Sequence, residues 1–300
     1  MQIIVLGAAA GGGFPQWNSN AQGCRRARAG DPAAPARTQA SIAVSGDGAQ
    51  WYVINASPDL RQQIAATPEL HPHTGLRSTP IAGVVLTGGD VDVIAGLLTL
   101  REREPFTLYA TQRILGILDA NPVFEVMARD VVGRVGLALD APVALAGGLT
   151  LTLFAVPGKV PLYMEEGTGM QAVRADETTV AALISDGTHR LFFIPGCAAM
   201  PAWLKERIDG ADALFFDGTL WADDEMIAAG IGTKTGQRMG HMSLSGAQGT
   251  LSTLADVRSG HKVLIHINNS NPVLLADTPE RAAAEAAGWA VAHDGMRIAL

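Results

Sequence analysis

The sequence predicts an α/β protein in which two β-sheets face each other and helices cover both outer faces, a four-layer αββα sandwich. Short strand-like runs alternate with helical patterns along the whole chain, which favours this layering. The 300 residues are 48% hydrophobic and 17% charged, enough apolar side chain for a large core. We therefore interpret residues 1–300 as one domain, with the Ala-, Pro- and Gly-rich stretch 27–37 as a surface loop rather than a linker.

The strands are predicted from short runs of Ile, Val, Leu and Phe, and the helices from apolar residues spaced three or four apart. In chain order, strands are expected at 3–6, 41–44, 51–55, 84–87, 106–110, 149–156, 180–185, 191–194, 213–216, 262–267 and 289–292. Helices are expected at 58–66, 94–103, 111–119, 201–208, 245–254 and 279–287. A doubly wound parallel sheet is the alternative. The glycine run 11–13 after the first strand suggests a dinucleotide loop, but its spacing is wrong and no helix pattern follows.

Charge and composition exclude several classes of function. The formal charge is −7, and the one basic cluster, Arg25, Arg26 and Arg28, indicates a solvated loop rather than a nucleic-acid surface. No segment approaches the roughly 20 apolar residues of a membrane span, and the N-terminus lacks a signal-peptide pattern, so we expect a cytoplasmic protein. The two cysteines, Cys24 and Cys197, cannot form a disulfide framework.

The most informative stretch is LTGGDVDVIAGL at 86–97, a polar turn between a predicted strand and a predicted helix. It resembles the turn in which metallo-β-lactamase-fold proteins carry Thr-His-x-His-x-Asp-His-x-x-Gly-Leu, and Asp92 takes the place of the motif's Asp. The other matches are Thr87, Gly96 and Leu97, whereas Gly88, Asp90 and Val93 replace the three histidines. The frame of a metal site is present without most of its nitrogen ligands.

Polar residues after other predicted strands supply further donors. His266 follows the run 262–265, at the position of the last metal histidine of this fold, and His241 begins the phrase before the helix predicted at 245–254. Cys197 and Asp217 follow two more strands. Each has a structural alternative: Asp92 as a cap of the following helix, His266 as a hydrogen-bonded core histidine, His241 as support for a helix cap. Cys197 fits a small buried apolar residue better than a reactive thiol.

Nine phrases in order along the chain resemble the PqqB family, the B proteins of pyrroloquinoline quinone (PQQ) biosynthesis. They are GGGFPQWN (11–18), RTQASIA (37–43), INASPDLR (54–61), GKVPLY (158–163), IPGCA (194–198), FDGTLW (216–221), GTKTG (232–236), RMGHMS (238–243) and HINNSNP (266–272). The resemblance implies a metallo-β-lactamase fold and iron- and oxygen-dependent hydroxylation of the tyrosine ring of a cross-linked Glu–Tyr precursor. An older proposal for the family implies a carrier of the quinone or its precursor towards the periplasm.

Two departures from the family pattern weaken the expected metal chemistry. The family usually has Asp-His where this chain has Asp92-Val93, so a facial set of one Asp and two His is reduced to Asp92 and His266. We expect these two as catalytic residues and metal ligands, with Asp90 as third ligand. Because carboxylates select Fe(II) less well than imidazoles do, we expect iron(II) at a weakened site, with zinc as its substitute.

The second departure concerns a structural zinc, for which many members carry Cys-x-Cys-x-x-Cys after Trp-Asn. The matching positions here are Ser19, Ala21 and Cys24. One thiol cannot hold a structural zinc, so we expect none.

The carboxylate-rich precursor predicts a cleft with cations and amide donors. Arg61 and Lys159 are candidates for charge pairing, with solvated surface residues as the alternative, and the polar candidates are His241, Asn268, Asn269 and Asn271. The expected partner is the small-molecule precursor or PQQ itself, joined by other proteins of the pathway and a second copy of the chain. A chain with a decayed metal site could instead act as a binding or carrier protein that uses the same cleft.

Overall fold

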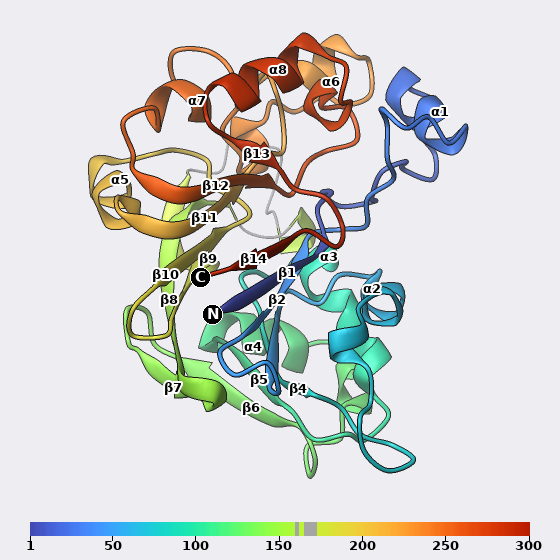
Figure 1. Ribbon diagram of the computed structural model, residues 1–300, viewed down its shortest axis with the longest axis vertical. Helices are drawn as coiled ribbons and strands as arrows, with labels where there is room; N and C mark the ends of the chain where they lie inside the picture. Colours follow the sequence, from blue (N-terminus) through green and yellow to red (C-terminus); the bar gives the residue numbers. More distant parts are fainter. Residues whose placement is uncertain (160–161, 165–172) are drawn as a thin grey trace.

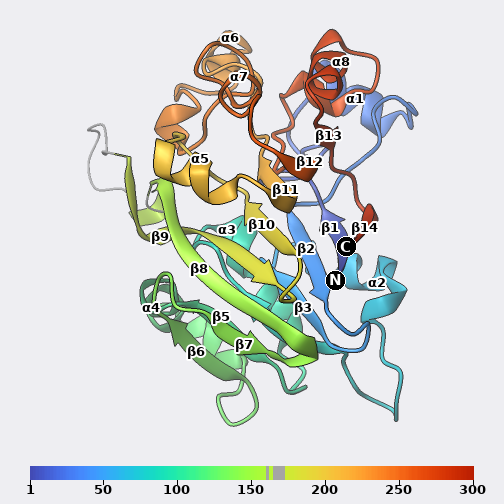
Figure 2. The same cartoon turned by 60° about the vertical axis from the view of Figure 1, so that its left-hand side comes forward.

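Two mixed β-sheets pack face to face in the computed structural model, which describes residues 1–159, 162–164 and 173–300 (Figure 1). The first sheet has the order β14-β1-β2-β3-β4-β5-β6 and the second β13-β12-β11-β10-β9-β8-β7. Helices lie on both outer faces: α2 and α4 cover the first sheet, and α5, α7 and α8 cover the second (Figure 2). The predicted four-layer α/β sandwich is confirmed.

The strands of the first sheet are β1 (Gln2–Gly7), β2 (Ser41–Ser45), β3 (Trp51–Ile54), β4 (Ile81–Val85), β5 (Thr107–Thr111), β6 (Gly133–Leu137) and β14 (Arg297–Ala299). Those of the second are β7 (Val143–Leu145), β8 (Leu149–Gly158), β9 (Arg174–Ser185), β10 (Arg190–Ile194), β11 (Ala211–Asp217), β12 (Ser259–Ile265) and β13 (Ala290–Val291). The α-helices are α1 (Gln22–Arg28), α2 (Leu60–Ala66), α3 (Val91–Ile94), α4 (Gln112–Asp119), α5 (Ala202–Ile208), α6 (Glu225–Ala228), α7 (Thr250–Thr253) and α8 (Pro279–Ala286). The 3-10 helices are η1 (Pro68–Leu70), η2 (Ala95–Leu100), η3 (Pro122–Val126), η4 (Ala146–Gly148), η5 (Leu162–Met164), η6 (Gln237–Met239) and η7 (Pro272–Leu274).

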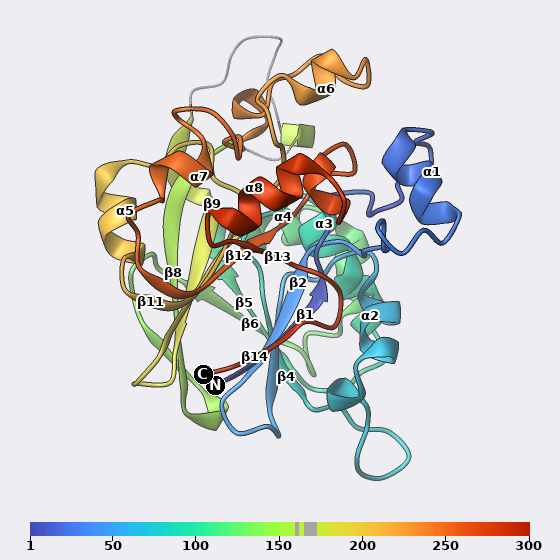
Figure 3. The same ribbon diagram turned by 45° about the horizontal axis from the view of Figure 1, so that its top comes forward.

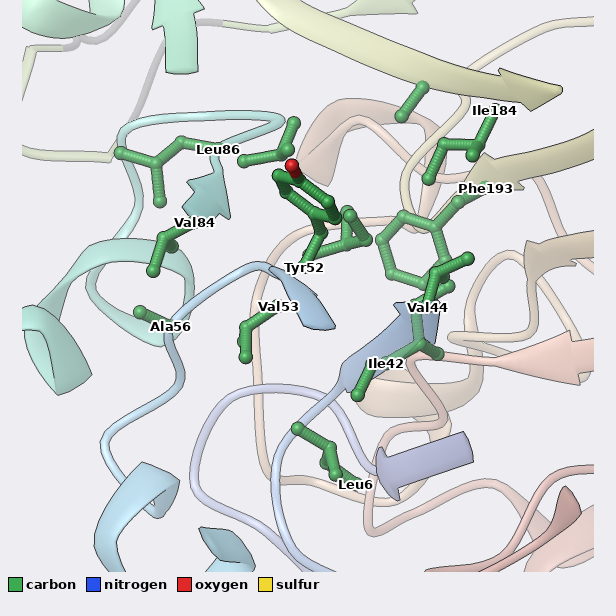
Figure 4. Close-up of a cluster of buried hydrophobic side chains, with 14 of the residues drawn as sticks. Leu6, Ile42, Val44, Tyr52, Val53, Ala56, Val84, Leu86, Ile184 and Phe193 are labelled. Carbon is green, nitrogen blue, oxygen red and sulfur yellow. The ribbon is translucent and has the colours of Figure 1, made fainter. Parts of the chain in front are cut away.

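The core fills the space between the two sheets. Val44 and Tyr52 of the first sheet point toward Ile184 and Phe193 of the second (Figure 4), and all four side chains are buried. A second apolar cluster lies on the outer face of the second sheet, where Phe216 packs with residues of α5 and α8. The second sheet therefore buries both faces, which explains why its strands β10 and β11 are near-continuous apolar runs.

Parallel pairing sets where the polar loops lie. In the first sheet β3, β4, β5 and β6 are parallel, and in the second β10, β11, β12 and β13 are parallel. The carboxyl ends of parallel strands meet at one edge of a sheet, so the loops after β4, β10, β11 and β12 gather there. The two termini lie side by side away from those loops (Figure 3), and the N-terminal ammonium donates a hydrogen bond of 2.8 Å to the carbonyl of Leu300.

Two predicted helices were wrong in extent. Instead of a helix over 94–103, the chain forms the one-turn α3 and the 3-10 helix η2, because the Gly96 N–H donates to the Ala56 carbonyl at 2.8 Å and leaves the helical pattern. The helix predicted at 245–254 is reduced to α7, since Gly246 has φ +87°, which a right-handed helix cannot include. Within the described residues, no helix is long and apolar enough to cross a membrane.

Candidate functional site

A cavity of about 460 Å³ opens where the polar loops of both sheets meet. Its described wall includes loop residues after β4 of the first sheet and after β11 and β12 of the second. The lining residues include Gln16, Thr87, Gly88, Asp90, Asp92, Val93, Lys159, Val180, Thr219, Met226, Lys234, Met239, His241, His266 and Asn268. The volume falls within the 300–1,000 Å³ that is usual for small-molecule sites.

His266 and Asp92 meet at the floor of this cavity. His266 Nε2 lies 2.9 Å from Asp92 Oδ2, although 174 residues separate them in the chain. His266 follows β12 with a left-handed backbone, φ +59°, which is uncommon for residues other than glycine. The Asp92 side chain therefore contacts the imidazole, and the N-cap position of α3 belongs to Asp90 instead.

The two groups shift each other's protonation. Burial opposes the charge on both, but the hydrogen bond and opposite charge outweigh it, so the pKa of Asp92 is lowered and the pKa of His266 is raised. Each group therefore favours the charged form of the other.

His241 completes a second contact with the same imidazole. Its ring stacks on His266 with 5.1 Å between centroids and an interplanar angle of 20°. His241 Nδ1 lies 2.7 Å from Asp217 Oδ2, at the end of β11, and Asp217 is fully buried. Parallel pairing of β11 with β12 brings Asp217 next to Ile265, one residue before His266.

Thr219 lies between these groups. Its Oγ1 is 2.6 Å from Asp217 Oδ1, 3.0 Å from His241 Nδ1 and 2.9 Å from His266 Nδ1. The sequence reasoning did not single out Thr219, because no spacing rule connects the loop after β11 with two histidines from other loops.

Ligand atoms of Asp217, His241 and His266 all lie within 4.8 Å of one another, so these three side chains are a candidate metal group. Two imidazoles and one carboxylate are the ligand types of non-haem Fe(II) sites and also suit zinc. His241 thus supplies a second imidazole to this group from a different loop, although the chain has Val93 where the motif has a histidine. The donor set fits a divalent transition metal.

The other predicted metal positions also lie at the cavity. Asp90, the predicted third ligand, lines it, as do Gly88 and Val93, two of the positions where the motif's histidines are replaced. Val93 is half-buried and packs against the main core. The cavity wall beside Asp92 is therefore apolar where a histidine would otherwise stand.

Only some of the predicted substrate-binding residues line the cavity. Lys159, His241 and Asn268 line the cavity, but Arg61 is an exposed residue of α2 outside the described lining. Asn271 is buried, and its amide donates to Gly218 O at 2.9 Å while its Oδ1 accepts from Val273 N at 3.0 Å. The Asn271 side chain thus stabilises the backbone conformation of its own loop.

The Asn269 side chain also makes hydrogen bonds within the protein: its amide donates to Gln16 Oε1, and its Oδ1 accepts from Cys24 Sγ at 3.6 Å. Gln16, which lines the cavity, was missed by sequence reasoning. Both cysteines are buried, which for Cys197 agrees with its interpretation as a small apolar residue. Burial, aided by the nearby Asp217 charge, raises the pKa of the Cys197 thiol, which keeps it protonated.

Lys234, Met226 and Met239 were also missed as cavity residues. The phrases 232–236 and 238–243 contain Lys234 and Met239 and were visible signals, whereas Met226 lies in none of the nine phrases. In the phrase 158–163, residues 160–161 lie outside the described residues.

Comparison with known proteins shows full-length similarity. A family model described as the beta-lactamase superfamily domain matches residues 50–267. Coenzyme PQQ synthesis protein B of Gluconacetobacter diazotrophicus is 65% identical over 304 residues, 99% of each chain, and that of Methylorubrum extorquens (strain AM1) is 55% identical over 300 residues, 100% of each. The crystal structure of zinc-bound PqqB from Methylobacterium extorquens superposes with a TM-score of 0.98 at 55% identity over all of both chains. A diphosphatase of the PhnP family, at 20% identity and a TM-score of 0.70, shares the fold.

Proposed function

The chain belongs to the coenzyme PQQ synthesis protein B family, within the beta-lactamase superfamily, and from this premise we propose that it acts in PQQ biosynthesis as a metal-dependent hydroxylase. Its substrate would be the tyrosine ring of a cross-linked Glu–Tyr precursor, with dioxygen as oxidant and an external two-electron reductant, so that one oxygen atom enters the ring as a hydroxyl group and the other leaves as water. The observation that supports this is the pair of imidazoles, His241 and His266, that line a substrate-sized cavity together with the carboxylates of Asp90 and Asp92.

The residues that would hold the metal are those that face the cavity. His266 and Asp92 were predicted as ligands from the motif, and His241 adds the second imidazole, with Asp90 as a further oxygen donor. Iron(II) bound by two histidines and one carboxylate supplies dioxygen activation in non-haem oxygenases.

The rest of the wall suits a zwitterionic aromatic substrate. Lys159 and Lys234 line the cavity and can pair with substrate carboxylates, each such hydrogen bond contributing about 1.5–3 kcal/mol. Val93 and Val180 offer apolar contact for an aromatic ring. Asn268 adds an amide, although it also donates to Ser270 Oγ at 2.6 Å.

The test is product formation by the iron-reconstituted protein. Incubation with a cross-linked Glu–Tyr substrate, dioxygen and a two-electron reductant should consume oxygen and give a product heavier by one oxygen atom for each hydroxylation, measured by an oxygen electrode and mass spectrometry. His266→Ala should abolish both signals. Oxygen uptake that is equal in the parent and the variant would contradict the proposal.

Val93 and Gly88 favour a second candidate function, a binding or carrier protein for PQQ or its precursor. The polar wall at Lys159 and Asn268 does not depend on a metal, so the metal-free protein should bind a pyrroloquinoline ligand in calorimetry. Binding only after iron is added would contradict the carrier function and support the enzyme. Binding in neither state would leave a scaffolding role.

A further inference from the structure

The imidazoles of the site have two different sides. Thr219, His241, His266 and Asp92 line the cavity, whereas Asp217 is fully buried behind them. On the buried side, His241 Nδ1 contacts Asp217 and Thr219, and His266 Nδ1 contacts Thr219. On the cavity side, His266 Nε2 contacts Asp92.

Asp217 has little capacity left for a metal ion. Its Oδ1 accepts from the Thr219 N–H at 3.0 Å and lies 2.6 Å from the Thr219 hydroxyl. Its Oδ2 accepts from the Cys197 N–H at 2.9 Å and contacts His241 Nδ1 at 2.7 Å. A metal on this carboxylate would have to displace donors that are themselves buried.

Thr219 has its hydroxyl within hydrogen-bond distance of Nδ1 of both histidines. Its hydroxyl has one proton, and the Asp217 carboxylate and the His266 carbonyl, at 2.9 Å, are the acceptors within reach. Its oxygen can then accept from Nδ1–H of the imidazoles. Protonation at Nδ1 leaves the Nε2 lone pair, at the opposite edge of each ring, for a ligand bond.

We propose that Thr219 and Asp217 are positioning residues that hold His241 and His266 with Nδ1 protonated, so that both Nε2 atoms face a metal together with Asp92. Asp217 is therefore an orienting partner rather than a ligand. This inference rests on the metal site of the proposed function. It requires no hydroxylation activity, so it can fail or hold independently of that chemistry.

The experiment measures zinc affinity by competition with a chelator, using the purified full-length protein. Thr219→Val, which removes the hydroxyl and keeps the shape, should weaken zinc binding by about tenfold to a hundredfold, and Thr219→Ser should restore it to within a few fold. Asp217→Asn should weaken binding by a similar factor while one zinc per chain is still bound at saturation. Asp92→Ala should weaken zinc binding more than Asp217→Asn does.

Long-range ¹⁵N–¹H spectra of the zinc-loaded parent protein provide a readout that does not depend on how the variants fold. Both site imidazoles should show a protonated Nδ1 and a metal-bound Nε2. A metal-bound Nδ1 on either ring would overturn the inference, as would equal zinc affinity in Thr219→Val and the parent, or failure of Thr219→Ser to restore it. A parent chain that binds no zinc would overturn it as well, whereas zinc binding without hydroxylation would contradict only the proposed activity.

Discussion

Replacing Asp217 by Ala should cost stability as well as site geometry. The side chain is fully buried and receives hydrogen bonds from the backbone N–H groups of Cys197 and Thr219 and a contact from His241. Removing it leaves these donors without their acceptor, at about 1–3 kcal/mol for each that water cannot reach. The Cys197 amide lies in a buried residue, whereas Thr219 and His241 border the cavity and can be rehydrated.

We therefore expect Asp217→Ala to lower the free energy of unfolding by about 1–3 kcal/mol, the cost of leaving the buried Cys197 amide without an acceptor. That is a substantial part of the roughly 5–15 kcal/mol that stabilises a typical domain. Asp217→Asn keeps one oxygen acceptor and should lose about half as much. Urea denaturation of the metal-free proteins, followed by circular dichroism, measures the difference.

Asp256→Ala is the matched control, because Asp256 is exposed and pairs with Lys205 on the surface. It should change the free energy of unfolding by at most about 1 kcal/mol. If Asp217→Ala loses less than about 1 kcal/mol, or no more than Asp256→Ala, the buried network does not have the energetic role that we assign to it.

Four further outcomes follow, three from the site and one from the ion pair at the N-terminus. His266→Ala should remove bound zinc, and Asp90→Ala should weaken it, as measured by metal content after dialysis; full retention in both variants would contradict the ligand assignment. Val93→His should raise zinc affinity in calorimetry, because it returns an imidazole to the wall beside the predicted ligands. Lys159→Met should weaken binding of the carboxylate-rich precursor by about tenfold in calorimetry, and unchanged affinity would remove Lys159 from the site. Although partial burial opposes it, hydrogen bonds from two backbone amides and the N-terminal ammonium hold the pKa of Asp186 well below its usual range. This stabilisation is present above the unfolded-state pKa of about 4 and is lost as the pH falls through the folded-state pKa. Asp186→Asn should therefore be less stable than the parent at pH 7. The difference between their free energies of unfolding, measured by urea titration, should shrink below about pH 4.

Buried apolar runs made the strands of the second sheet predictable. The runs 191–194 and 213–216 are β10 and the body of β11, because strands that are covered on both faces leave a continuous apolar signal. Strand β6 was missed because Gly133–Leu137 contains two glycines and is mostly exposed, and β14 because three residues carry no periodicity. Helix α1 was missed because its seven residues bury little apart from Cys24.

For the site, sequence motifs identified residues but could not show how they pair. Asp92 and His266 were predicted together from a known frame, and the structure brings them into contact. The stacking of His241 on His266 depends on the packing of two loops, which no local pattern encodes. For Arg61 the sequence left a substrate-binding and a solvated surface residue as alternatives, because a charged residue gives no sign of which side of its helix faces solvent; the structure places it exposed on α2, outside the described lining.

The contact between Asp92 and His266 joins the first sheet to the second, since one follows β4 and the other β12. A ligand that needs both residues can bind only the sandwich with its halves assembled, and by thermodynamic linkage it must resist their separation. At a concentration of 100 times its dissociation constant, such a ligand adds about 2.7 kcal/mol to the folded state. The melting temperature of the chain therefore reports how much of the site is occupied by the ligand. A mutation far from the cavity that loosens one sheet against the other will lower the apparent affinity for this ligand without altering any side chain of the site.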